Sequence, residues 1–190
     1  GKTTMAPQIF SEQIKHGAWG ITAGAINQIQ VMFDFGIKKV LLANQLLGKS
    51  HLETIASYIN QNKNFSFYCF VDSIEQFLNI KKNLGDQNLT NPINLLPEVG
   101  AENGRTGIRK KEDFLKLVNI IGEDSSKNFT FAGISSYEGI AAVAMKGSDA
   151  VHDFCSKIED IINDIPSNYY SHLNELLITA GGSTHFDIVG

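Results

Sequence analysis

The sequence predicts an α/β protein built on a (β/α)8 barrel, of which this chain supplies only part. Short apolar runs of the β type alternate with longer stretches whose apolar residues recur at helical spacing, as in successive βα units. Polar and glycine-rich residues follow the predicted strands, where ligands bind in parallel α/β folds. The 190 residues fit one domain, residues 1–190, and fall short of the ~250 residues of a closed barrel.

Composition narrows the class of protein. The content of 43% hydrophobic and 19% charged residues is typical of globular domains, and a net charge of -4 without a basic stripe argues against binding to nucleic acid. No window approaches the roughly 20 apolar residues of a membrane span, and no signal-peptide pattern is present. Cys69 and Cys155 lie far apart in apolar stretches, which favours buried, reduced thiols without a disulfide. We therefore expect a cytoplasmic protein without nucleic-acid or membrane partners.

The first elements are predicted from apolar spacing and from their end signals. A helix over residues 4–16 takes Thr3 or Thr4 as its cap, tolerates Pro7 in its first turn and stops at Gly17. The elements that follow are a strand over 19–23, a helix over 26–35 that ends at Gly36, and a buried strand over 39–43.

Capping signals predict where the next two helices begin. Ser50 with Glu53 forms the Ser-x-x-Glu pattern of a capping box, and Ser73 with Gln76 forms its glutamine version. Apolar residues at helical spacing follow both signals, so each is predicted to open a helix that packs on the sheet.

The remaining elements complete six predicted strands. Pro97 weakens one of them, because proline removes a ladder donor and implies a bulge or an early end. A stub ending at Lys2 counts as the first strand, so the first strand's body and an eighth strand are missing from a closed barrel. A doubly wound seven-strand sheet fits the same alternation. The remaining elements are strands over 65–71, 93–99, 129–134 and 176–180, and helices over 114–121 and 148–165.

Polar side chains gather at the carboxyl ends of these strands. The turn over 181–184 offers backbone N–H groups and two hydroxyls that can hold a phosphate, although glycines after a strand also make ordinary turns. Lys2 can form a Schiff base where its surroundings lower its pKa, whereas a solvated surface lysine is the commoner alternative. The strand-end residues are Lys2, Thr22, Ala23, Asn44, Gln45, Asp72, Glu98 with Arg105, Tyr137, Glu138, Gly181, Gly182, Ser183 and Thr184.

Six collinear segments lie at these strand ends: 1–7 (GKTTMAP), 17–23 (GAWGITA), 40–46 (VLLANQL), 104–107 (GRTG), 137–139 (YEG) and 179–183 (TAGGS). Together they resemble the D-serine dehydratase and D-threonine aldolase family, and within it the branch of amino-acid deaminases or D-serine deaminase-like proteins. The resemblance extends over essentially the whole chain. It implies a fold type III barrel of the alanine racemase N-terminal kind, with a C-terminal β-domain that this chain lacks.

The resemblance implies pyridoxal 5'-phosphate as the cofactor and assigns roles to residues. Lys2 would form the Schiff base and then move the proton at Cα, with Tyr137 near the pyridine ring as a second catalytic residue. Arg105 would lie beside the ring, and Gly181, Gly182, Ser183 and Thr184 would take part of the phosphate. The alternatives are an ion pair of Arg105 with Glu98 or Glu102 and a rim tyrosine that packs on the next helix.

The function that the resemblance implies is a lyase of D-amino acid metabolism, which dehydrates and deaminates D-serine or another β-hydroxy D-amino acid to a 2-oxo acid and ammonia. D-threonine aldolase, amino-acid racemase and a non-catalytic pyridoxal-phosphate-binding protein are the alternatives. The family holds a divalent metal, Zn or Mn, in the C-terminal domain, so we expect no metal ligand here and interpret His185-x-Asp187 as a coincidence. We expect a homodimer for the full-length protein. This chain by itself should have weak or no activity, because an open barrel exposes two strand edges.

One basic cluster, Arg109 with Lys110 and Lys111, is interpreted as a solvated helix start.

Overall fold

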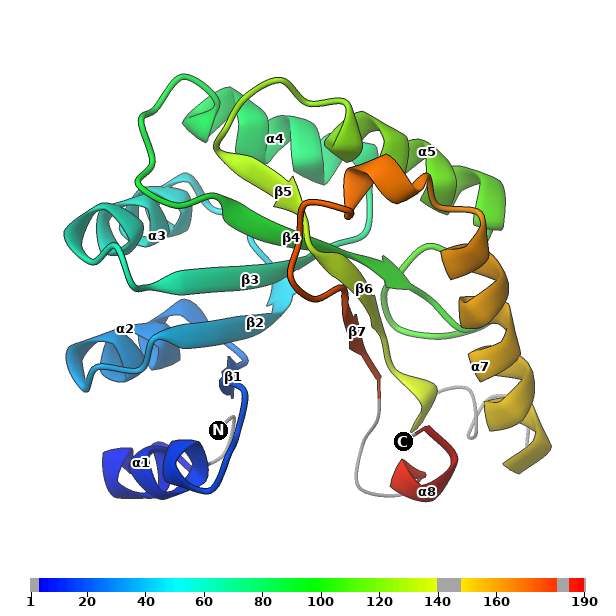
Figure 1. The fold of residues 1–190 in the computed structure, drawn as a ribbon, viewed down its shortest axis with the longest axis horizontal. Coiled ribbons are helices and arrows are strands. Elements are labelled where there is room, and N and C mark those ends of the chain that lie inside the picture. Colours follow the sequence, from blue (N-terminus) through cyan, green and yellow to red (C-terminus); the bar gives the residue numbers. More distant parts are fainter. Residues whose placement is uncertain (1–3, 140–147, 181–184, 190) are drawn as a thin grey trace. The chain divides into compact units, whose positions relative to one another are not determined.

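A computed structural model describes residues 4–139, 148–180 and 185–189, and its helices and strands alternate along the chain as predicted (Figure 1). The helices are α1 (Pro7–Lys15), α2 (Ile26–Asp34), α3 (Lys49–Gln61), α4 (Ile74–Leu84), α5 (Lys111–Gly122), α7 (Ser148–Asn163), α8 (Phe186–Val189) and the short η1 (Ser167–Tyr169). The strands are β1 (Ile21–Ala23), β2 (Lys39–Gln45), β3 (Ser66–Val71), β4 (Ile93–Val99), β5 (Phe129–Phe131), β6 (Gly133–Ser136) and β7 (Leu177–Thr179). None of the described helices is long and apolar enough to cross a membrane.

The chain forms two compact units whose segments alternate along the sequence. Unit 1 consists of Gly1–Phe70, Glu75–Leu95 and Ser125–Thr130, and unit 2 of Val71–Ile74, Leu96–Asp124 and Phe131–Gly190. The boundary falls within β4, so both units contain part of that strand.

The strand pairs β1–β2, β2–β3, β4–β6 and β6–β7 are parallel and follow the order of the chain, and β5 pairs with β4 off this path. In unit 1, β1 pairs with β2 and β2 with β3, and β4 is the next strand. In unit 2, β6 lies between β4 and β7, with Glu98 opposite Ser135 and Ser135 opposite Thr179. A doubly wound sheet reverses its strand order at a switch point. Neither unit contains such a reversal, which favours the barrel over the doubly wound alternative.

The apolar spacing of the sequence corresponds to the buried core. In unit 1, α3 buries Leu52, Ile55, Ala56 and Ile59, and the ring of Phe77 in α4 meets Phe129 edge-on with 5.7 Å between centroids. In unit 2, α5 buries Phe114, Leu117, Val118 and Ile121. Each helix thus places a stripe of residues spaced three or four apart against the strands, which is the largest stabilising contribution expected in such a fold.

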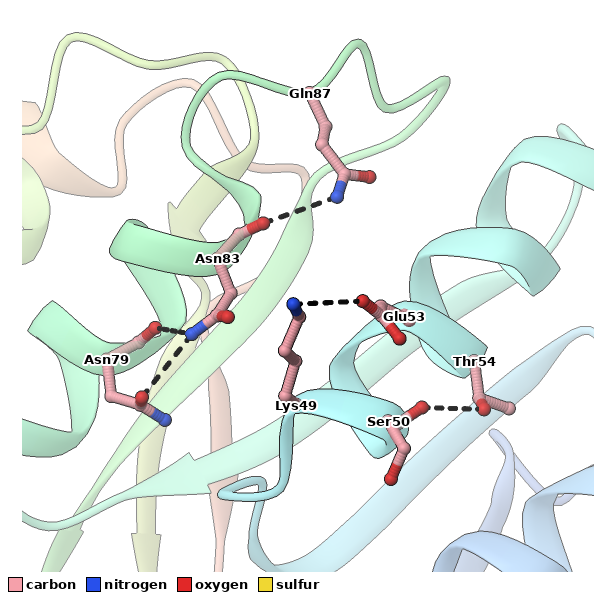
Figure 2. A network of polar contacts seen from close by, with 7 residues as sticks. All are labelled: Lys49, Ser50, Glu53, Thr54, Asn79, Asn83 and Gln87. Atoms are coloured by element: carbon pink, nitrogen blue, oxygen red, sulfur yellow. Dashed lines mark hydrogen bonds and ion pairs between the residues drawn. The ribbon is translucent and has the colours of Figure 1, made fainter.

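Two of the predicted helix caps are wrong. Helix α1 has Ala6 at its N-cap, and α3 begins one residue after Gly48, with no side-chain cap hydrogen bond at either. The two residues of the predicted box lie inside α3 instead, as Figure 2 shows: the carbonyl of Ser50 accepts from the Thr54 hydroxyl, and Glu53 forms a 3.8 Å ion pair with Lys49.

The other predicted helix starts and ends agree better with the structure. Pro7 opens α1, and Gly17 and Gly36 follow α1 and α2 with φ of 92° and 75°. Helix α4 begins directly after Ser73, while the Gln76 amide donates to the carbonyl of Phe70 in the core. Further along α4 and beyond its end, Asn79, Asn83 and Gln87 form hydrogen bonds one turn apart (Figure 2).

The strand predicted over 129–134 is divided at Ala132 into β5 and β6. Gly133 has φ of 146°, and a Cβ there would come within 1.8 Å of the Leu177 carbonyl oxygen. Only glycine permits this conformation and this approach. By contrast, Pro97 does not end its strand, because β4 pairs with β6 at Glu98 and Val99 beyond it.

One buried side chain in unit 1, Asn128, joins the segment before β5 to the turn after α4. Asn128 is 5% exposed, and its amide donates to the carbonyls of Leu84, Gly85 and Gln87 over 2.6 to 3.0 Å. Its oxygen accepts from the N–H of Leu89. This single residue therefore satisfies four backbone groups that have left the helix.

Replacing Asn128 with Asp should lower the free energy of unfolding by about 3 kcal/mol, because a carboxylate cannot donate to three buried carbonyl oxygens. Urea denaturation followed by circular dichroism measures the change. The matched control is Asn174→Asp, in which an exposed side chain undergoes the same chemical change. Equal stability of the two variants would contradict the role given to Asn128.

Both cysteines are free in the structure, but only one of them is fully buried. Burial raises the pKa of the Cys69 thiol to about 12. Cys155 is half-buried, which corrects the prediction of burial for this residue, and burial followed by the charges of Glu138 and Glu159 raises its pKa as well. Cys69 is therefore a core residue, whereas Cys155 remains within reach of solvent.

At pH 8 the folded protein should react with iodoacetamide at Cys155 and leave Cys69 unmodified. A pKa of about 12 leaves about one Cys69 in 10,000 as the reactive thiolate, and its side chain is inaccessible. Peptide mapping by mass spectrometry distinguishes the two sites, and unfolding in urea should make them react alike. Early modification of Cys69 in the folded protein would contradict its placement in the core.

Candidate functional site

A small cleft in unit 2 lies where β4 and β6 end. It is formed by the last residues of β4, the loop that follows them and Tyr137, which comes directly after β6. Its volume is about 20 Å³, which is room for about one water molecule. Two of the predicted site residues, Arg105 and Tyr137, line this cleft together with Glu98 and Thr106. The structure thus brings together side chains that lie 32 positions apart in the sequence.

The loop over residues 100–109 returns to the end of its own strand. The N–H of Gly100 donates to the carbonyl of Ile108 over 2.9 Å, and the N–H of Ile108 donates to the carbonyl of Glu98 over 2.8 Å. Val99 and Ile108 form an isolated parallel bridge. These hydrogen bonds close the loop and hold its backbone in place, and the side chain of Arg105 extends from that backbone.

Two glycines allow the two ends of this loop to cross in contact. Gly107 has φ of 85°, and a Cβ there would lie 2.6 Å from the Gly100 nitrogen. A Cβ on Gly100 would lie 2.6 Å from the Thr106 carbonyl oxygen. Any side chain at either position would force the two backbone segments apart.

The side chain of Arg109 forms hydrogen bonds with two backbone carbonyls of the same loop. Its guanidinium donates to the carbonyls of Gly104 and Gly107, and its own carbonyl accepts from Lys157 of α7 over 2.7 Å. The prediction of a solvated helix start at 109–111 is therefore wrong for Arg109. It is also wrong for Lys111, which forms a 2.8 Å ion pair with Asp164. Sequence reasoning missed Arg109 because its partners are backbone carbonyls, which leave no pattern in side-chain types.

Two carboxylates accept hydrogen bonds from the same loop. Glu98 is 5% exposed and its Oε1 accepts from the Thr106 hydroxyl over 2.9 Å. The Oδ2 of Asp72, which follows β3, accepts from the N–H of Gly107 at 3.5 Å. Both acids had been placed at strand ends from the sequence, and in the structure both contact loop 100–109.

Arg105 and Tyr137 are the exposed side chains of the cleft. Among the residues that the structure describes, Arg105 forms no ion pair, so the alternative of a pair with Glu98 or Glu102 is not realised. Tyr137 is 49% exposed, and its ring lies so close to Gly139 that a Cβ there would come within 2.7 Å of it. The cleft therefore presents a cation and an aromatic ring to solvent.

A buried hydroxyl that sequence reasoning missed lies deeper in unit 2. Ser135 is 0% exposed, and its Oγ has no hydrogen-bond partner among the described residues. It stands in register between Glu98 and Thr179, and strand alternation places it on the same face as Tyr137. That alternation is the only sequence signal that could have indicated it. Glu138, in the helical turn that follows β6, is 1% exposed, and its charge acts on Cys155 of α7.

Several predicted site residues lie outside the described part of the chain, namely Lys2, Gly181, Gly182, Ser183 and Thr184. In unit 1, the Asn44 side chain bonds to backbone: its oxygen accepts from the N–H of Gln45 over 3.0 Å, and its amide donates to the carbonyl of Gly24 at 3.5 Å. His185 and Asp187 lie at the start of α8, and no group of three or more His, Cys, Asp or Glu within the described ranges could hold a metal ion.

Known structures resemble this chain. D-threonine aldolase from Filomicrobium marinum superposes with a TM-score of 0.77 and 22% identity over 97% of this chain and 48% of that one. Alanine racemase from E. faecalis superposes with a TM-score of 0.63 and 15% identity over 90% of this chain and 46% of that one. No family model matches the chain, and neither does any curated protein sequence.

These likenesses confirm the predicted fold class, a partial (β/α)8 barrel of the alanine racemase N-terminal kind. The chain spans about half the length of the solved chains that it resembles. At 22% and 15% identity, the likeness bears on the fold alone.

The loop that carries Arg105 should loosen when Arg109 is replaced with Ala. Amide hydrogen exchange at Gly100 and Ile108 should accelerate about tenfold or more, because two charge-assisted hydrogen bonds to the loop are lost. Arg105→Ala is the matched control, since its guanidinium bonds to no described part of the loop. Identical exchange in the two variants would contradict the role of Arg109.

Proposed function

We propose that the protein is a pyridoxal-phosphate-dependent enzyme that acts on small D-amino acids. The observation that carries this proposal is the convergence of Arg105 and Tyr137 on one cleft at the strand ends of a fold shared with D-threonine aldolase and alanine racemase. Both residues come from the segments that resemble the D-serine dehydratase and D-threonine aldolase family.

The described residues fit part of such a cofactor. A planar anionic ring is favoured beside a cation and an aromatic surface, and Arg105 and Tyr137 offer these at the mouth of the cleft. The cleft of about 20 Å³ is too small for the ring itself, so the exposed faces of these side chains would contact it. Lys2 and the 181–184 turn complete the proposed set, with the turn binding the phosphate.

When bound, the cofactor supplies an electron sink for the substrate's Cα. The chain's own residues orient the substrate and move its protons. Lys2 would bind the cofactor aldehyde and then take the proton from Cα, which requires a pKa well below that of free lysine, ~10.4. Arg105, as a permanent cation, would favour the deprotonated form of the cofactor's phenolic oxygen. Tyr137 would donate or accept a proton at the ring's edge.

Dehydration of D-serine to a 2-oxo acid and ammonia is the specific reaction that we propose, on the resemblance of the six strand-end segments. Cleavage of D-threonine is the second candidate, because the resemblance of the same segments includes the D-threonine aldolases, with one of which this chain shares its fold. For the full-length protein we also propose a homodimer, with a Zn or Mn ion held outside the described residues. Two free cysteines support a reducing, cytoplasmic location.

Full-length protein mixed with pyridoxal phosphate should develop a Schiff-base absorbance band, and borohydride should then fix the cofactor at Lys2. Lys2→Ala should lose both signals, whereas Lys15→Ala, which removes an exposed lysine of α1, should keep them. Mass spectrometry of the reduced protein identifies the modified lysine. An unchanged spectrum in Lys2→Ala would refute the assignment.

Product analysis then separates the two reactions. Pyruvate and ammonia from D-serine support dehydration, whereas glycine and acetaldehyde from D-threonine support the second candidate. Tyr137→Phe should lower kcat about 100-fold if the phenol transfers a proton, with cofactor binding retained. Cofactor binding without turnover of either D-amino acid, or of D-alanine to L-alanine, would leave a pyridoxal-phosphate-binding protein and overturn the enzymatic proposal.

A further inference from the structure

A second cleft lies in unit 1, at the amino-terminal ends of β1 and β2. Its volume is about 500 Å³, within the range of small-molecule sites. It is lined by the last turns of α1 (blue in Figure 1), by Phe35 and Gly36 directly after α2, and by the residues that lead into the two strands. The strand ends with Ala23 and Gln45 lie at the opposite ends of β1 and β2, so this cleft takes no part in the proposed cofactor site.

The walls of this cleft are largely apolar and accessible. Ile14 is 40% exposed, Trp19 36% and Phe35 63%, and Ile37 forms a buried part of the wall. Large side chains of this kind are normally scattered singly over a surface, whereas here they meet in one concave site. Such a surface favours an apolar ligand.

The charge of the cleft is positive although the protein is acidic overall. Three of its ten lining residues are lysines, Lys15, Lys38 and Lys39, and none of the ten is acidic. Glu12 forms a 3.5 Å ion pair with Lys15 and removes one charge, and the carboxyl ends of α1 and α2 add about -0.5 each. The sum is about +1, in a chain whose net charge is -4.

One of the lysines, Lys39, lies over the Trp19 ring, and a carboxylate can replace this ring as the partner of its ammonium group. The Nζ of Lys39 lies 4.9 Å from the centroid of the Trp19 ring, and that ring meets Tyr68 edge-on at 4.8 Å. A cation over an exposed indole gains only a weak attraction, so an arriving carboxylate can draw the ammonium away from the ring. The indole face that this uncovers can then pack against an apolar body.

We propose that this cleft binds a small organic carboxylate with an aromatic body, through the lysines at 38 and 39 and the apolar wall of Ile14, Trp19 and Phe35. The carboxylate takes the place of solvent at the ammonium groups, and the aromatic body covers the exposed apolar side chains.

Trp19 is the single tryptophan of the chain, so its fluorescence reports on this site alone. Titration of the full chain with 4-biphenylacetate should change the emission saturably, with a Kd on the order of 1 mM or tighter. The neutral 4-biphenylacetamide should bind at least about fivefold more weakly, because it lacks the charge that meets the lysines.

Two variants test the charge contribution. Lys38→Met should weaken the carboxylate to about the affinity of the amide and leave the amide unchanged. Lys63→Met removes an exposed lysine elsewhere in unit 1 and should change neither. The proposal is overturned if the amide binds as tightly as the carboxylate, if both variants behave alike, or if Trp19 shows no saturable response. The measurement needs neither cofactor nor turnover, so its outcome is independent of the function proposed above.

Discussion

The contact between the backbones of Gly100 and Gly107 is the constraint on which the candidate site depends. Because neither residue has a Cβ, the loop after β4 can return to the end of its own strand and bond there. Arg109 then donates to the carbonyls of Gly104 and Gly107. The carboxylates of Glu98 and Asp72 accept from the Thr106 hydroxyl and the Gly107 N–H. Because these hydrogen bonds hold the loop closed, the side chain of Arg105 is not used for closure and can contact a ligand.

Much of the fold could be predicted from the sequence, since the alternation of apolar spacing determines which segments become strands and which become helices. The predicted helix starts were less accurate. Ser50 and Glu53 have the spacing of a capping box, but Gly48 already has the extended backbone that opens a helix, so the box lies inside α3. The division at Ala132 was also missed, because the approach of the Leu177 carbonyl to Gly133 joins residues 44 positions apart. Local patterns carry no record of such contacts.

The same distinction applies to the site. Arg105 and Tyr137 could be found because each lies in a short segment with a recognisable pattern, directly after a strand. Ser135 and Arg109 could not, since the first is an ordinary strand residue by its letter and the second bonds only to backbone. The cleft beside Trp19 was missed for a similar reason: its lysines and apolar residues come from two helix ends and two strand starts, which only the fold brings together.

The alternation of the two units along the sequence bears on how the protein is made. Unit 1 is not complete until residues 125–130 have been synthesised, and the segment 96–124 of unit 2 is synthesised before them. Asn128 belongs to that last piece, and its amide binds the carbonyls of Leu84, Gly85 and Gln87 at the turn after α4. During synthesis, the first four helices therefore lack the last segment of their own unit until about 30 residues of the other unit have been made. The packing of unit 1 can therefore be completed only after translation has passed Asn128.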